Sequence, residues 1–190
     1  DGTPMWLVMS DGARQADGAF AGPLYRARGP VFNARPWGTI SLAQSGTMTL
    51  RFTDAKTGSL EYTYDGTRVT RAIQVQAFGS PVPTCTWSAF DRSFSRHLQD
   101  LWWNPSESGW GLNVAQQGDT VFATLFTYDA TGKGAWYVMS NGALNANQTG
   151  FSGTLYKTSG RSFDSTPWVP VTVTPVGTMQ GDAATSGNSM

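Results

Sequence analysis

Six residues in the segment LWWNPSESGWGLNVAQQGD (residues 101–119) combine flat aromatic rings with polar side chains at short spacing. Such rings stack on the C–H groups of a sugar, and nearby amide or carboxylate groups bind its hydroxyls. The same rings could instead pack as a plug at one end of a β-barrel, and we favour that interpretation. The alternative is a ligand-binding site formed by Trp102, Trp103, Asn104, Glu107, Trp110 and Asn113.

The chain offers few groups for catalysis, since His97 is its only histidine and Cys85 its only cysteine. A zinc site built from several histidines is therefore excluded within one chain. Cys85 and His97 could form a thiol–imidazole pair, but no residue pattern near them orients or activates the thiol. Cys85 has no second cysteine for a disulfide among these residues, so we expect it to be a buried small residue or to have a partner on another chain or outside residues 1–190.

The acidic residues favour turn formation over chemistry. A glycosidase pair would have to combine Glu107 with an aspartate such as Asp119 or Asp129, and the spacing does not support this. No G-x-S-x-G or D-x-[DN]-x-[DN]-G string occurs, so neither a serine nucleophile nor a calcium loop is indicated. We therefore predict no enzyme activity, no cofactor and no metal site. The loop aspartates considered for calcium are Asp11, Asp17, Asp54, Asp65 and Asp129.

Composition indicates a turn-rich all-β protein. The chain has 22 Gly, 10 Pro and 8 Trp but few lysines, and its formal net charge is zero. The absence of a basic stripe argues against nucleic-acid binding, and no apolar stretch reaches the length of a transmembrane helix. Few lysines with abundant Thr, Asn and Gly favour a bacterial secreted, periplasmic or cell-surface location, although residue 1 does not begin a signal peptide.

Two blocks of the sequence repeat. MWLVMSDG (5–12) aligns with AWYVMSNG (135–142), and residues 18–48 align with 149–179 through F-x-G-x-L-Y, Pro-Trp and Gly-Thr-Met. The two copies are incomplete at opposite ends, and overlaying them reconstructs a unit of about 110 residues, a common domain size. We therefore expect the rear part of a first β repeat in residues 1–79, a connector in 80–100, and the front part of a second repeat in 101–190.

Alternating apolar residues predict eight strands for the complete unit, with no sustained helical period. Antiparallel neighbours joined by short loops favour an eight-stranded meander β-barrel, with a β-sandwich as the alternative. One short helix is expected at residues 90–101. The expected strands are Trp110–Gln117, Val121–Tyr128, Trp136–Ser140, Phe151–Lys157, Val169–Thr174, Thr47–Thr53, Leu60–Tyr64 and Val69–Phe78.

In this chain the rear strands of one unit precede the front strands of the next. Residues 1–130 contain enough strands to close one barrel, which leaves residues 136–174 as surplus strands. Exposed strand edges pair readily with other chains. We therefore expect self-association through strand exchange or dimerisation.

The string WWNPSESGWGLNVAQQGD, followed by FATLFTYDATGKGAWYVMS, resembles a tandem repeat of secreted proteobacterial proteins. The resemblance covers most of the chain and implies secretion and modular use, but carries over no catalytic residue. The first copy departs from the pattern because it lacks this opening motif. Together, these features predict a secreted, non-catalytic β-barrel module that binds a glycan or other ligand, or alternatively a structural module that assembles by strand exchange.

Overall fold

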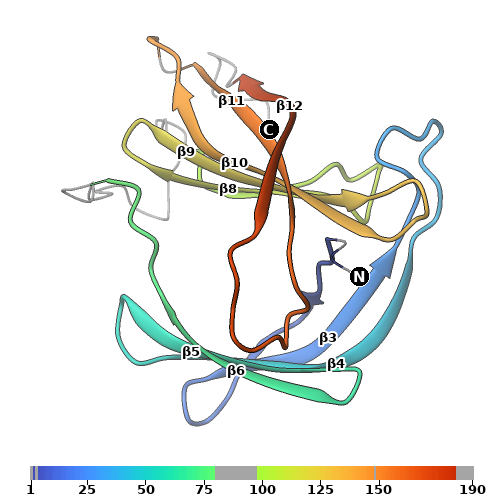
Figure 1. Ribbon diagram of the computed structural model, residues 1–190, viewed down its shortest axis with the longest axis vertical. Coiled ribbons are helices and arrows are strands. Elements are labelled where there is room, and N and C mark those ends of the chain that lie inside the picture. Colours follow the sequence, from blue (N-terminus) through green and yellow to red (C-terminus); the bar gives the residue numbers. More distant parts are fainter. Residues whose placement is uncertain (1, 3, 80–97, 148, 183–190) are drawn as a thin grey trace. The chain divides into compact units, whose positions relative to one another are not determined.

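The computed structural model describes residue 2 and residues 4–79, 98–147 and 149–182. These residues form strands, turns and loops in two antiparallel sheets (Figure 1), so the all-β prediction is confirmed. Of the helix expected at residues 90–101, residues 90–97 lie outside the described part. Asp100 and Leu101 belong to a strand, so the helix prediction is wrong there.

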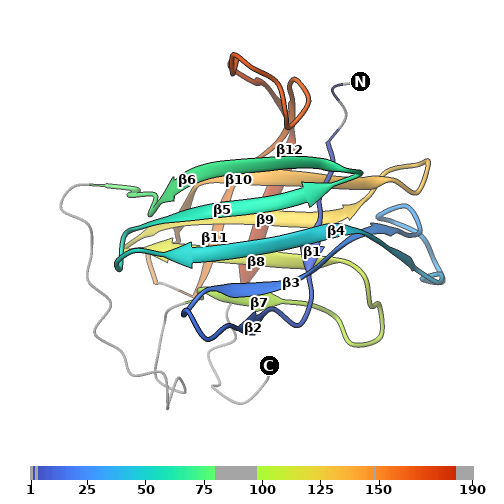
Figure 2. The ribbon, with the colours of Figure 1, turned by 90° about the horizontal axis from the view of Figure 1, so that it is seen from below.

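The first sheet, sheet A, has the strand order β1-β3-β4-β5-β6, with β2 also paired to β3. Figure 2 shows β3, β4, β5 and β6 as consecutive neighbours. Asp65 and Gly66 connect β5 to β6 with φ values of 46° and 81°, as the Asp-Gly hairpin signal predicts. The strands are β1 (Val8–Met9), β2 (Ala13–Arg14), β3 (Phe20–Arg28), β4 (Ser41–Phe52), β5 (Thr57–Tyr64) and β6 (Thr67–Gln74).

The second sheet, sheet B, is a meander with the order β12-β11-β10-β9-β8-β7. Its central strand β9 buries Val121 and Ala123 completely, while Phe122 on the opposite face is half-buried. The ladders of the described residues therefore form two separate sheets and no closed barrel. The strands are β7 (Asp100–Trp102), β8 (Gly111–Gln117), β9 (Thr120–Tyr128), β10 (Gly134–Leu144), β11 (Gly150–Ser159) and β12 (Thr172–Asp182).

The expected strands Val169–Thr174 and Thr47–Thr53 are corrected by the structure. The two segments align with the two ends of one long strand of the repeat. Thr47–Thr53 overlaps the end of this strand in the first copy, β4, and Val169–Thr174 overlaps its beginning in the second copy, β12. A register shift opposite Leu24 and Tyr25 lets β4 continue without a break, and β12 has the same irregularity opposite Leu155 and Tyr156. A bulge bends a strand while its ladder continues. The two strands that the sequence predicts for the complete repeat are therefore a single bent strand.

Aligned residues of the two sequence blocks have aligned ladder partners. Val8 lies opposite Tyr25 in sheet A, and Val138 lies opposite Tyr156 in sheet B. Strand β3 pairs with β4 in the same register as β11 pairs with β12. The matching pairs are Phe20–Leu50 and Phe151–Gly181, Gly22–Met48 and Gly153–Met179, and Leu24–Gly46 and Leu155–Gly177.

The contacts within the chain divide it into two compact units, each made of three segments. Unit 1 contains Asp1–Gln76, Thr127–Ala135 and Gly160–Pro170. Unit 2 contains Ala77–Phe126, Trp136–Ser159 and Val171–Met190.

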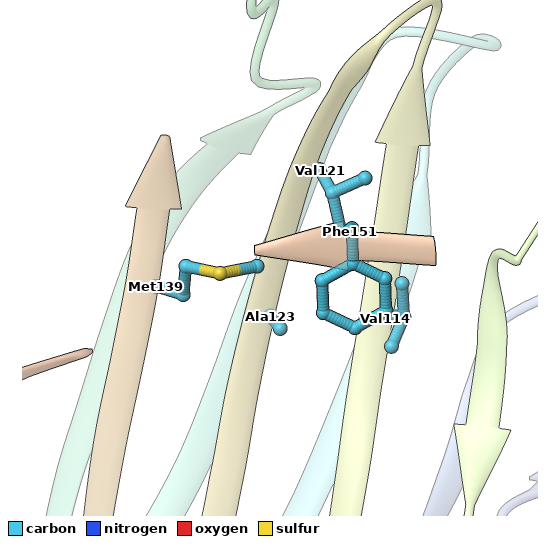
Figure 3. Packing of buried hydrophobic residues seen from close by; sticks show 5 residues of the cluster. All are labelled: Val114, Val121, Ala123, Met139 and Phe151. Atoms are coloured by element: carbon cyan, nitrogen blue, oxygen red, sulfur yellow. The ribbon is translucent and has the colours of Figure 1, made fainter. Parts of the chain in front are cut away.

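Unit 2 has a core on β8, β9, β10 and β11. Figure 3 shows five of its buried side chains gathered together, with Met139 extending from β10 towards Ala123. Glycines make room for this methionine, because a Cβ at Gly153 would lie 2.7 Å from the Met139 sulfur and a Cβ at Gly142 would also collide with it. The core side chains are Val114, Val121, Ala123, Met139 and Phe151.

Unit 1 is packed around aromatic side chains from three segments. The Trp6 ring lies 5.7 Å from that of Tyr128, and its Nε1–H donates to the Thr127 carbonyl at 2.9 Å. Tyr128 is fully buried, and burial raises its pKa to about 12. A Cβ at Gly29 would collide with this ring, which explains the glycine there. Trp6 and Tyr128 therefore fix the hairpin 127–135 within unit 1.

A second aromatic cluster in unit 1 contains Phe163. Its ring lies 5.9 Å from that of Tyr62 and 5.3 Å from that of Tyr64, with an edge-on arrangement in the second pair. Arg71 donates to the Phe163 carbonyl at 3.4 Å. The aligned residue of the first block, Phe32, is 59% exposed. The same sequence position is therefore packed in one copy and exposed in the other.

Candidate functional site

The segment between β7 and β8 is held by its own hydrogen bonds. The Asn104 side-chain oxygen accepts the Ser106 N–H at 2.9 Å, and the Asn104 carbonyl accepts the Glu107 N–H at 3.0 Å. Asn and Asp side chains commonly accept from the backbone two residues onward, which stabilises a turn. Asn104 is therefore a turn-forming residue.

Glu107 and Trp110 are joined within the same turn. The indole Nε1–H of Trp110 donates to Glu107 Oε2 at 3.2 Å, and both side chains are half-buried. A half-buried indole N–H requires an acceptor, and the carboxylate provides it. The bond holds the Glu107 carboxylate beside the Trp110 ring and orients that ring.

Trp102 belongs to the core of unit 2. Its half-buried ring packs against the buried cluster, and its Nε1–H donates to the Leu98 carbonyl at 3.0 Å. Alternation along β7 directs consecutive side chains to opposite faces of the sheet. Trp102 is therefore a packing residue of this core.

Trp103 and Asn113 are the exposed members of the six. Trp103 is 62% exposed, and Asn113 is exposed opposite Leu101 in the ladder between β7 and β8. Leu101, which is 73% exposed, was not among the sequence candidates. Its alternation with Trp102 is the signal that could have identified it. The structure thus brings Leu101 and Asn113 together and leaves the Trp103 ring accessible.

Two of the loop aspartates that were candidates for calcium binding stabilise turns by accepting hydrogen bonds. Asp129 accepts from the Thr131 hydroxyl at 2.7 Å and from the N–H groups of Thr131 and Lys133. The Thr131 hydroxyl bond is the main cause that lowers the Asp129 pKa. Asp54 accepts the Lys56 N–H at 2.7 Å, which is the main cause of its own lowered pKa. Throughout the described residues, no group of three or more His, Cys, Asp or Glu side chains is arranged for a metal.

The connector and its two reactive residues lie outside the described residues. Cys85 and His97 both fall within residues 80–97, so their expected pairing stays a prediction. Among the residues that are described, no helix has the length and apolar character needed to cross a membrane.

The outer edge of β12 is a second candidate site. Strand β4 is paired with β3 on one edge and β5 on the other, whereas β12 is paired only with β11 among the described residues. Three valines along or just before β12 are exposed: Val171, Val173 and Val176. Exposed apolar residues on an open strand edge are typical of a surface that pairs with another strand.

The glycines at the bulges show the same contrast. A Cβ at Gly46 would collide with the Thr63 carbonyl, because β5 passes close to β4 at this point. A Cβ at the aligned Gly177 would have no described atom within 4 Å. No described residue therefore fills, beside β12, the space that β5 fills beside β4.

No family model, no curated protein and no solved structure matches this chain.

Proposed function

We propose that this protein is a non-catalytic β module that assembles with other polypeptides by adding a strand at the outer edge of β12. In this proposal the chain contains two partial copies of one repeat, which explains why, in the part of the chain that the structure describes, β12 has one paired edge and the aligned β4 has two. An eight-stranded meander barrel is the proposed closure of a complete repeat, with a sandwich as the alternative.

The observation that carries the proposal is the difference between the β4 and β12 edges. Strands β3–β4 and β11–β12 pair in the same register, yet among the described residues only β4 has a further neighbour, β5. Open edges expose unpaired N–H and C=O groups, which an added strand satisfies. We therefore expect β12 to recruit a strand from another chain.

Sedimentation velocity of the full chain over a wide concentration range tests the proposal. We expect dimers or larger species at high concentration, which Thr178→Lys on β12 suppresses because edge lysines oppose pairing. The control Thr154→Lys places the same charge on β11, where both edges are already paired. A chain that stays monomeric at millimolar concentration would contradict the proposal.

A second candidate function is sugar binding at Trp103. The observation favouring it is the accessible Trp103 ring, near a strand pair on which Leu101 and Asn113 are also exposed. Ring faces stack on sugars while an amide binds hydroxyls. Bacterial secreted, periplasmic or cell-surface placement belongs to the same proposal, since extracellular polysaccharides would then be accessible.

Affinity electrophoresis against a panel of soluble polysaccharides tests this second candidate. At least one polysaccharide should retard the wild type, and Trp103→Ala should abolish the retardation. Trp168, which is 65% exposed in unit 1, provides the matched control Trp168→Ala. If no polysaccharide retards the wild type, or if both variants behave alike, Trp103 is not a sugar-binding residue.

A further inference from the structure

We propose that the strand accepted by β12 has the pattern of β5 and comes from another repeat of the same kind, antiparallel to β12. This inference rests on the proposed function and identifies the partner at that same edge. It follows from the aligned strand β4, whose neighbour is present in the structure. Strand addition gains affinity from main-chain bonds and specificity from alternate side chains, so the partner's pattern matters.

The β4–β5 ladder defines the expected register. Met48 lies opposite Tyr62, and Leu50 lies opposite Leu60. The sequence alignment and the shared β3/β11 register place Met179 of β12 at the position of Met48. A docked strand therefore places a Tyr beside Met179, which remains half-buried in sheet B.

Most of the polar groups with which β4 binds β5 and the turn after it have counterparts on β12. The Thr47 N–H donates to Thr63 Oγ1 at 3.0 Å, and the two threonine hydroxyls lie 3.2 Å apart. Thr178 aligns with Thr47 and keeps both the N–H and the hydroxyl. The Ser45 carbonyl accepts the Asp65 N–H at 3.1 Å, and a backbone carbonyl is equally present at the aligned Val176.

The partner strand requires a residue without a side chain at position 177. The Thr63 backbone passes over Gly46 so closely that any side chain at Gly46 would displace it. No atom of residues 4–79, 98–147 or 149–182 lies within 4 Å of the same point at Gly177, and Gly177 has no positive φ that would require glycine for its backbone. A glycine without a local conformational reason often marks close approach of another backbone. The open space beside Gly177 fits the Thr carbonyl of a β5-type strand.

The probe for this inference is a labelled synthetic peptide of residues 57–66, TGSLEYTYDG, titrated against the full chain by fluorescence polarisation. Wild type should bind the peptide and not a scrambled version. Gly177→Val should weaken binding by at least about tenfold, which is a readily measured change. Gly79→Val is the matched control, since Gly79 also has no described atom within 4 Å but lies outside β12.

A nitroxide at the peptide's first residue tests the direction of docking. Antiparallel pairing brings it near the Asp182 end of β12, so amide signals there should broaden more than those near Thr172. Equal binding by Gly177→Val, or broadening at the Thr172 end, overturns the proposed register. If the chain self-associates through β12 but does not bind the peptide, the partner is wrong and the proposed function stands. If neither occurs, both fail.

Discussion

Strands β4 and β12 occupy aligned positions in the sequence and pair with their preceding strands in the same register, but their other edges differ. The β4 edge is covered by β5, so Gly46 lies beneath the Thr63 backbone. The β12 edge has no such cover among the described residues, and Gly177 faces open space. The residue pattern therefore determines where the strand forms. The neighbouring strand determines how strongly a substitution at an aligned glycine destabilises the protein.

The largest expected effect is a valine at Gly46. The added side chain would meet the Thr63 carbonyl, and relieving this clash requires β5 to move. Overpacking typically costs about 1–3 kcal/mol, and we expect about 3 kcal/mol or more here because the obstacle is backbone. Urea unfolding followed by tryptophan fluorescence measures the change in the free energy of unfolding.

The matched substitution Gly177→Val should change the free energy of unfolding by less than about 0.5 kcal/mol, as for open surface sites. Equal destabilisation by the two valines would show that Gly177 is covered by another part of the chain. The contrast between the edges would then be wrong.

A second comparison is between the aligned methionines. Met139 is fully buried between Gly142 and Gly153, whereas Met9 is half-buried beside Gly12 and Gly22. Met139→Ala should therefore destabilise the protein by about 2–4 kcal/mol through lost burial and a cavity. Met9→Ala should cost about half as much, since less of its surface leaves water. Thermal unfolding of both variants measures this, and a larger loss at Met9 would contradict the deeper burial of Met139.

The aligned phenylalanines provide a third comparison. Phe163 contacts the rings of Tyr62 and Tyr64, while Phe32 is 59% exposed. Phe163→Ala should cost about 1–2 kcal/mol, combining partial burial with two aromatic contacts. Phe32→Ala should be nearly neutral. Denaturant midpoints for the two variants, measured side by side, decide the matter, and equal midpoints would mean that Phe163 does not hold its loop in unit 1.

The smallest expected effect concerns Asp129 and pH. The Asp129 pKa is lowered, chiefly by the Thr131 hydroxyl, so the carboxylate contributes stability above its unfolded pKa near 3.9. That contribution is lost as pH falls through the lower folded pKa. Asp129→Asn should therefore lower the urea midpoint slightly at pH 7 and much less at pH 2.5. A difference that stays the same at both pH values would exclude a role for the charge.

Much of the strand architecture could be predicted because it depends on local alternation. The strands around Val121, Phe151 and Leu60 appear where period-two patterns placed them, and Asp65-Gly66 makes the expected hairpin turn. The division of the β4 and β12 regions into shorter strands was wrong. A bulge opposite Leu24 keeps the strand continuous, and nothing in the local sequence distinguishes a bulge from a break.

The candidate site was predictable as a segment but not residue by residue. Trp102 and Trp103 are adjacent and chemically identical, yet one packs on the core and the other is 62% exposed. Which ring faces the core depends on the strand phase relative to the sheet, and one residue of shift would exchange them.

The sequence by itself determined where strands, hairpins and matching blocks occur, because alternation and turn residues act over a few neighbouring positions. Only the tertiary structure decided which edges are covered. Gly46 and Gly177 lie in aligned segments, but their environments differ because the Thr63 backbone covers Gly46. Thr63 belongs to a different strand, β5. Edge pairing depends on which distant segment lies beside a strand, and the strand's own residues do not specify it.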